Sequence, residues 1–177
     1  LNAAGRIDDM TLGIECLLAD APSSAQQLAQ RLATLNRARR NVETDMLEEA
    51  LAILASFKPA DSCSLTAWQP GWHIGVIGIL ASRLKDKFHR PTIVFASNDG
   101  GELKGSGRSI PGLHLRDVLD LIDKRHPGLI NKFGGHAMAA GLSIPAGRHE
   151  EFAEAFEVVV SELIDPADLE AVIETDG

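Results

Sequence analysis

Hydrophobic residues recur at three- and four-residue steps over one long stretch of the chain, which is the spacing of an amphipathic helix. The stretch runs from about residue 24 to residue 57, after "APSS" and before "KPAD", and has a single apolar stripe. At 1.5 Å per residue it would span roughly 50 Å. A long helix with one narrow stripe is typical of a strut between two bodies rather than of a core element. The stripe consists of Leu28, Leu32, Leu35, Val42, Met46, Ala50 and Ile53.

From residue 62 onward the pattern changes to strands alternating with helices. Apolar runs predict strands at 63–68, 91–97, 101–109 and 139–145. Helical periodicity predicts helices at 73–88, 115–122 and 149–164. The "NDGG" turn indicates a hairpin between the second and third strands. Because helices separate the first strand from the second, and the second from the fourth, at least part of the sheet should be parallel or mixed.

The two ends of the chain have patterns of their own. Residues 1–21 predict a turn and then a helix, with Asp8 or Asp9 placed to cap it. The closing "DLEAVIETDG" alternates and ends in turn residues, as the first strand of a further unit would. Both ends therefore indicate a fragment of a larger protein.

The composition, 45% apolar and 24% charged residues, is that of a soluble globular protein. The longest apolar run, 74–81, is far shorter than the roughly 20 residues of a membrane span. No signal peptide opens the chain. The two cysteines, Cys16 and Cys63, lie far apart in no metal-binding pattern, which suits a reducing compartment. We therefore expect a cytoplasmic protein with no membrane partner.

The formal net charge of −8 is unevenly distributed along the chain. Residues 62–149 hold 11 basic and 6 acidic side chains, together with all six histidines. Residues 150–177 hold 10 acidic side chains and no basic one. The middle of the chain is thus a locally positive body with an acidic tail, so the total charge does not exclude an anionic ligand.

The first stretch that could carry chemistry is "QPGWHIGVIGI", residues 69–79. It places His73 at the expected start of a helix, where free amides and the helix dipole favour an anion. Gly75 and Gly78 each cost a helix about 1 kcal/mol relative to alanine, so another part of the molecule should approach closely there. Taken alone, the stretch favours a second interpretation. In that interpretation Gly78 packs the helix on the sheet, and Trp72 is buried with its indole N–H bonded.

The second stretch is "KGSGRS", residues 104–109, which offers a good inventory for a phosphate. Arg108 can bind one bidentately, while Ser106, Ser109 and the bare backbone at Gly107 can donate further hydrogen bonds. Lys104 adds a positive charge. The order of residues matches neither a Walker loop nor a dinucleotide fingerprint. A plain hairpin with solvated charges is an equally good interpretation.

The third stretch is "FGGHAMAAG", residues 133–141. Gly134 and Gly135 allow the chain to turn with positive φ and to approach a ligand, and His136 projects from that clearing. Its imidazole could donate to a phosphate oxygen, or it could instead satisfy a buried carbonyl beside the turn. The sequence gives no case for a metal site, because His73 and His136 lack acidic or cysteine neighbours.

Taken together and in order, "LNAAGRIDD", "GWHIGVIGILASRL", "GSGRS" and "FGGHAMAAG" resemble the RecJ family of single-strand-specific exonucleases, within the DHH phosphoesterase superfamily. The resemblance implies an α/β fold, with a long connecting helix followed by a mixed-sheet DHH-associated domain with flanking helices. It divides the chain into the C-terminal end of a DHH domain (1–21), the connecting helix (22–59), the associated domain (60–164) and the start of an oligonucleotide-binding domain (165–177).

The resemblance also implies hydrolysis of single-stranded DNA from its 5′ end, with Mn²⁺ or Mg²⁺ held by DHH-domain motifs upstream of Leu1. It assigns no catalytic or metal-binding residue to this chain, which should bind no metal and be inactive alone. By this resemblance, the residues of this chain that would bind phosphates are Arg6, Ser106, Arg108 and His136. His73 and Lys104 are further candidates. The implied partners are single-stranded DNA and proteins of the repair machinery.

Two other functions remain open. The associated domain also occurs in small-oligonucleotide phosphoesterases and in alanyl-tRNA synthetases, although the long helix and "LNAAGR" favour RecJ. A non-catalytic adaptor could instead bind a protein through the acidic tail and the helix stripe. With two tryptophans, six phenylalanines and no tyrosine, base stacking cannot be widespread, so backbone contacts should dominate nucleic-acid binding.

Overall fold

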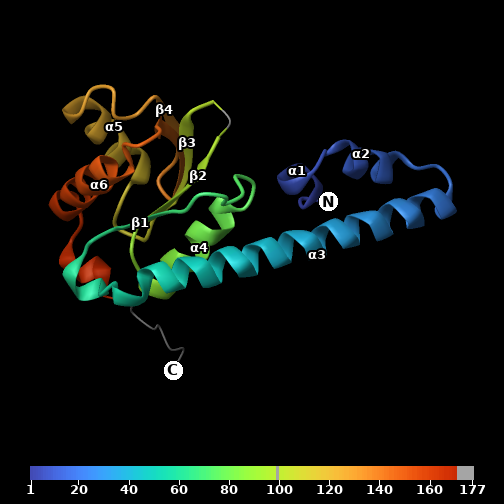
Figure 1. Cartoon of the computed structure of the whole chain (residues 1–177), viewed down its shortest axis with the longest axis horizontal. Coiled ribbons are helices and arrows are strands. Elements are labelled where there is room, and N and C mark those ends of the chain that lie inside the picture. The colour runs from blue at the N-terminus through green and yellow to red at the C-terminus, as the bar shows by residue number, and fades with distance from the viewer. Residues whose placement is uncertain (99, 171–177) are drawn as a thin grey trace.

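The structure is a computed structural model that describes residues 1–98 and 100–170. An α/β body and a small helical arm are joined by one long helix, α3 (Pro22–Ile53) (Figure 1). The predicted connecting helix is confirmed, but it ends at Ile53 because the next residues tighten into a 3₁₀ turn, Leu54–Ser56. A second 3₁₀ turn, Pro59–Asp61, leads into the body.

The arm consists of α1 (Ala4–Ile7) and α2 (Thr11–Leu18), which fold back along the N-terminal half of α3 (Figure 1). Ala4, Leu12 and Leu32 form the buried cluster between them. Met10 is the N-cap of α2 and forms no side-chain cap bond. Asp9, one residue earlier, accepts from the amide and the hydroxyl of Thr11, the first residue of α2, at 2.9 and 2.8 Å.

The body is built on a five-stranded sheet in the order β1-β2-β3-β5-β4. β1 and β2 are parallel and the other pairs are antiparallel, so the predicted mixed sheet and the predicted β2–β3 hairpin are confirmed. One strand, β4, was not predicted, because "KFGG" has no alternating apolar pattern. The strands are β1 (Leu65–Trp68), β2 (Thr92–Ser97), β3 (Glu102–Arg108), β4 (Lys132–Gly135) and β5 (Ala139–Pro145).

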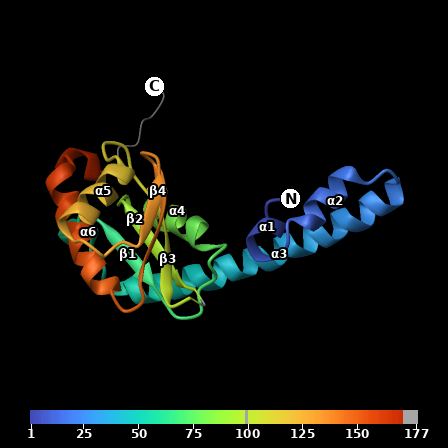
Figure 2. The ribbon, with the colours of Figure 1, turned by 90° about the horizontal axis from the view of Figure 1, so that it is seen from above.

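Helices cover the two faces of the sheet unequally (Figure 2). α5 (Leu115–Arg125) and α6 (His149–Leu163) bury one face against a core that includes Phe95, Phe152 and Ile144. On the other face α4 (Ile77–Phe88) packs against β2 and β3, with α3 behind it. The α4 side of β4 and β5 is therefore left open.

The helix predicted over 73–88 begins later, at Ile77. Residues 73–76 form a turn in which the Val76 amide donates to the His73 carbonyl (2.9 Å) and the Gly75 amide donates to His73 Nδ1 (3.0 Å). The histidine ring thus bonds an amide of the turn that precedes the helix. The prediction that placed His73 at the helix start is wrong.

The strand predicted at the C-terminal end falls partly outside the described residues. Pro166–Leu169 form a 3₁₀ helix instead, and residues 171–177 are not described. Arg90, which is buried, holds this end in place. Its guanidinium donates to the carbonyls of Leu169 (2.7 Å), Ser62 (2.7 Å) and Pro59 (2.6 Å). It therefore joins the second 3₁₀ turn and the residue after it to the C-terminal segment. None of the helices in the described parts of the chain has the length and apolar content that a bilayer crossing requires.

The half-buried imidazole of His149 should make folding stability depend on pH. Its ring lies 6.1 Å from that of Trp68 and 5.5 Å from that of Phe95, and burial lowers the pKa of His149 below 6.5, against a smaller opposing effect of Glu150. Since the unfolded chain binds the proton more readily, the free energy of unfolding should fall as the pH drops below about 6.5. In denaturant titrations at several pH values, His149→Phe should flatten this fall. Parallel pH profiles for the two proteins would contradict it.

Candidate nucleic-acid interface

The open half of the sheet presents the polar side chains of β3. Side chains alternate along a strand, so Lys104, Ser106 and Arg108 share the α4 side of the sheet. The intervening Gly105 and Gly107 face the opposite core, where a Cβ would lie 2.6 Å from Leu142 and 2.7 Å from Leu115, respectively. The "KGSGR" pattern therefore places its polar groups on one face and keeps its glycines for packing.

Beside Ser106 the sheet has no side chains. Ser106 is opposite Gly141 on β5, and Gly141 is opposite Gly134 on β4. A Cβ on Gly134 would meet nothing within 4 Å, and one on Gly141 would meet only a carbonyl oxygen at 3.9 Å. Both residues are exposed. We call this bare strip, Gly134 and Gly141, the glycine floor.

Basic residues border the glycine floor on both sides. Lys104 and Lys132 lie on one border, since both have the same register partner on β5. Arg108 lies on the other border, opposite Ala139, whose carbonyl accepts from the His136 amide at 2.9 Å. With strands about 4.8 Å apart, the backbones of Arg108 and His136 are roughly 10 Å apart. They are on the same part of the molecule, at one end of the floor.

Helix α4 forms a wall beside Arg108. A Cβ on Gly78 would lie 3.0 Å from Nη2 of Arg108 and 3.0 Å from Oγ of Ser106, so a glycine lets the guanidinium lie against the helix. Nη1 of Arg108 donates to Ser106 Oγ (3.2 Å) and to the Gly107 carbonyl (2.7 Å). Among the described residues Arg108 forms no ion pair. The group is thus oriented but lacks a counterion.

Arg6 of the arm reaches the same wall. Its Nη1 donates to the Gly75 carbonyl at 3.4 Å, and a Cβ on Gly75 would overlap the Arg6 carbonyl oxygen. The prediction that another part of the molecule approaches Gly75 is confirmed, and that part is α1. Arg6, Lys104, Ser106 and Arg108 line one cleft of about 440 Å³, together with Gly141. Burial, and secondarily the charge of Arg6, lower the pKa of Arg108.

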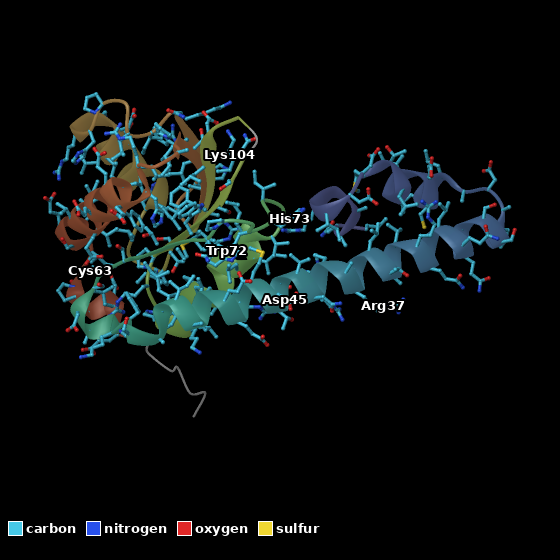
Figure 3. The ribbon with its side chains drawn as sticks, in the orientation of Figure 1. Arg37, Asp45, Cys63, Trp72, His73 and Lys104 are labelled. Carbon is cyan, nitrogen blue, oxygen red and sulfur yellow. The ribbon has the colours of Figure 1, made fainter. Side chains whose placement is uncertain are left out.

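The turn that carries Gly75 is anchored to α3. Trp72 is 4% exposed, and its Nε1 donates to Oε2 of Glu49 on α3 at 2.7 Å. The second interpretation of this stretch, a buried tryptophan with a bonded indole, is therefore also confirmed. Figure 3 shows Trp72 between the body and α3, and His73 and Lys104 on the side of the body towards α1.

Three of the predicted site residues contribute to the packing and hydrogen bonding of the fold. Ser109 is 1% exposed and donates to the Leu113 carbonyl at 2.8 Å, so its hydroxyl cannot reach a ligand in the cleft. Gly107 lies between β2 and β5, where its backbone belongs to the sheet. Gly135 has φ +150°, and a Cβ there would lie 2.5 Å from the Ala139 carbonyl oxygen. Whether any of the three also contacts a ligand stays a prediction.

Two weaker candidates, Lys104 and His73, already bond to neighbouring residues. Nζ of Lys104 pairs with Glu102 at 2.7 Å, which reduces its net charge in the cleft. Nδ1 of His73 already accepts from Gly75, so only Nε2 is left for a ligand. Gly141 and the wall residue Gly78 were not predicted as site residues, because their roles depend on a strand register and a helix position that the sequence does not reveal.

The cleft does not suit a metal ion. Its polar side chains are guanidinium, ammonium and hydroxyl groups, and the cationic ones repel a divalent cation. Within 1–98 and 100–170, no three His, Cys, Asp or Glu side chains are grouped in a way that could hold a metal.

Comparison with known proteins gives a consistent picture. The DHHA1 domain family matches residues 61–162. Single-stranded-DNA-specific exonuclease RecJ of Dickeya dadantii is 51% identical over 180 residues, and that of Escherichia coli is 47% identical. Both alignments cover 100% of this chain and 31% of the relative, so the chain spans about a third of their length. The crystal structure of RecJ from Thermus thermophilus in complex with Mn²⁺ superposes with a TM-score of 0.81 at 28% identity, covering 94% of this chain and 24% of that one.

Gly75→Ala should detach the arm from the body, because the added methyl group overlaps the Arg6 carbonyl. We expect a loss of about 1–3 kcal/mol in the free energy of unfolding, as for other overpacked contacts, and faster hydrogen exchange in α1. Gly100→Ala is the matched control, because its nearest neighbour is a side-chain atom at 3.8 Å. Unchanged exchange in α1 would show that the contact does not hold the arm.

The two adjacent glycines of β4 should respond differently to alanine. Gly134→Ala adds a methyl group in open space and should change the free energy of unfolding by less than about 0.5 kcal/mol. Gly135→Ala should cost about 1–3 kcal/mol, because it combines strained backbone with a clash. Thermal or denaturant unfolding of both variants measures the difference. A loss in Gly134→Ala as large as that expected for Gly135→Ala would mean that the floor is not open at Gly134, and no loss in Gly135→Ala would contradict the clash there.

Proposed function

The chain belongs to the DHHA1 domain family, in its RecJ form, and from that premise we propose that it provides the phosphate-gripping side of a DNA cleft in a 5′-to-3′ single-stranded-DNA exonuclease. The observation that carries the proposal is the Arg108 guanidinium, which lies against Gly78 with no ion pair among the described residues. Burial, and secondarily the nearby charge of Arg6, lower its pKa. A phosphodiester would supply the missing negative charge. The divisions of the chain implied by the resemblance, 1–21, 22–59, 60–164 and 165–177, are part of this proposal.

Each part of the cleft has a role in holding the strand. Arg108 binds a phosphate bidentately and Ser106 donates a further hydrogen bond, while Arg6 contributes charge from the arm. The glycine floor admits the sugar–phosphate backbone because no side chain rises from it. His136 and Lys132 are at its borders, where they contact neighbouring phosphates. These contacts do not read bases, so binding is independent of sequence.

The hydrolytic metal ions belong elsewhere in the full-length protein. Two of the similar RecJ structures are complexes with Mn²⁺ or Mg²⁺. The residues of this cleft do not fit such an ion, so its ligands come from outside this chain, and this chain alone binds DNA without cleaving it. What Arg6, Ser106 and Arg108 supply is the position of the phosphate and stabilisation of negative charge as it is attacked.

Replacement of Arg108 by alanine in the full-length protein tests the proposal. Cleavage of a 5′-phosphorylated single-stranded oligonucleotide should fall by about 100-fold, as when one preorganised donor is lost, while the metal content stays the same. Arg108→Lys should recover part of the loss, because it keeps the charge but not the bidentate geometry.

The matched control is Arg116→Ala, which removes an exposed arginine from α5, on the opposite face of the sheet. It should leave cleavage unchanged. Full cleavage by Arg108→Ala would exclude the cleft as the DNA site. A full-length protein that hydrolyses dinucleotides but ignores longer strands would favour the small-oligonucleotide phosphoesterase alternative.

A further inference from the structure

A second hollow lies on the other side of Arg6, between the arm and the middle of α3. It is a groove of about 830 Å³, lined by α1, α2, α3 and Ile79 of α4. Arg6 lines both this groove and the phosphate cleft, so the two are contiguous across its side chain. Nothing in the proposed cleft function uses the groove.

Small residues on α3 keep the groove open. Ala29 and Ala33 are one helical turn apart on the side of α3 that lines the groove, and both are exposed. Asn36 and Arg39 continue this side of the helix, and Asn2 faces them from the arm. Leucines of the arm and Ile79 supply apolar walls. The volume is within the range of roughly 300–1,000 Å³ that is usual for small-molecule sites.

Two polar groups of the groove, Asn36 and Arg39, are held in place by neighbouring side chains. Nε of Arg39 donates to Asn36 Oδ1 at 3.3 Å, and its Nη1 pairs with Glu43 at 2.8 Å. The other oxygen of Glu43 accepts from Nε of Arg83 on α4 at 3.2 Å. This network orients Arg39 and leaves the Asn36 amide nitrogen without a bond among the described contacts.

The lining matches the parts of a nucleotide. The guanidinium of Arg6 suits a phosphate, and the side-chain amides of Asn2 and Asn36 can pair with the donors and acceptors of a base edge. The apolar walls can pack against a base or sugar. We propose that this groove, which we call the release groove, binds a nucleoside 5′-monophosphate, the product of cleavage in the adjoining cleft. The proposal rests on the proposed exonuclease function. Arg6 links the two hollows and passes the phosphate from one to the other.

The test measures binding of deoxyadenosine 5′-monophosphate to the full-length protein by calorimetry, without DNA, and its inhibition of cleavage. Ala33→Trp fills the release groove and should raise the dissociation constant at least about tenfold and weaken the inhibition to match, while the KM for single-stranded DNA stays the same. Ala38→Trp, at an exposed α3 position outside the groove lining, is the matched control and should change neither. Asn36→Ala, a milder change, should weaken binding in the same direction.

Three results would overturn the proposal. Nucleotide binding could be unchanged in Ala33→Trp, or it could be lost only in Arg108→Ala, which would place the nucleotide in the phosphate cleft. Ala33→Trp and Asn36→Ala could also both unfold the full-length protein while Ala38→Trp does not, which would show that another part of the polypeptide fills the groove. Failure of the exonuclease function is seen separately, as undiminished cleavage by Arg108→Ala, because the calorimetric measurement involves no cleavage.

Discussion

The missing side chain at position 78 is the constraint on which the candidate interface depends. It allows the Arg108 guanidinium to lie in the angle between α4 and the sheet, with Ser106 beside it. A cation in this position is partly removed from water and lies near Arg6, and these two effects, burial first, lower its pKa. It also lacks an anionic partner among the described residues. A charge without a partner among the described residues lowers the stability of the fold, as is common at functional sites.

The long helix α3 brings the arm to the body, so that Arg6 lines the same cleft as Arg108. One apolar stripe on α3 sets the distance between the two parts, but it does not fix how they face each other. Polar contacts do so at separate points: Glu49 holds Trp72, and Glu43 holds Arg83. The backbone of α1 then meets the turn at Gly75. The cleft and the release groove are two consequences of this one arrangement, with Arg6 between them.

Local patterns predicted most of the fold because helices are coded by neighbours in sequence. The periodicity located the long connecting helix, the helices after β3 and β5, and the β2–β3 hairpin turn. It missed β4, since "KFGG" forms a strand only by pairing with β5. It also extended α4 back to His73, because the apolar spacing continues through residues 74–77 and gives no sign of the turn in which that imidazole bonds the Gly75 amide. For the site, the sequence did not reveal the burial of Ser109, since that burial depends on a loop that closes on Leu113.

The sequence by itself determined the fold class and the chemical character of the site. Its apolar periods are local, and most of the glycines and polar groups of the candidate site lie in short stretches. Only the tertiary structure decided which of those groups meet. The register of β3 with β5 and of β5 with β4 places Arg108 and His136 at one end of the glycine floor, and the contact at Gly75 adds Arg6 from 69 positions away. Which groups meet depends on how segments far apart in the sequence pack together, and no local sequence pattern contains those packing energies.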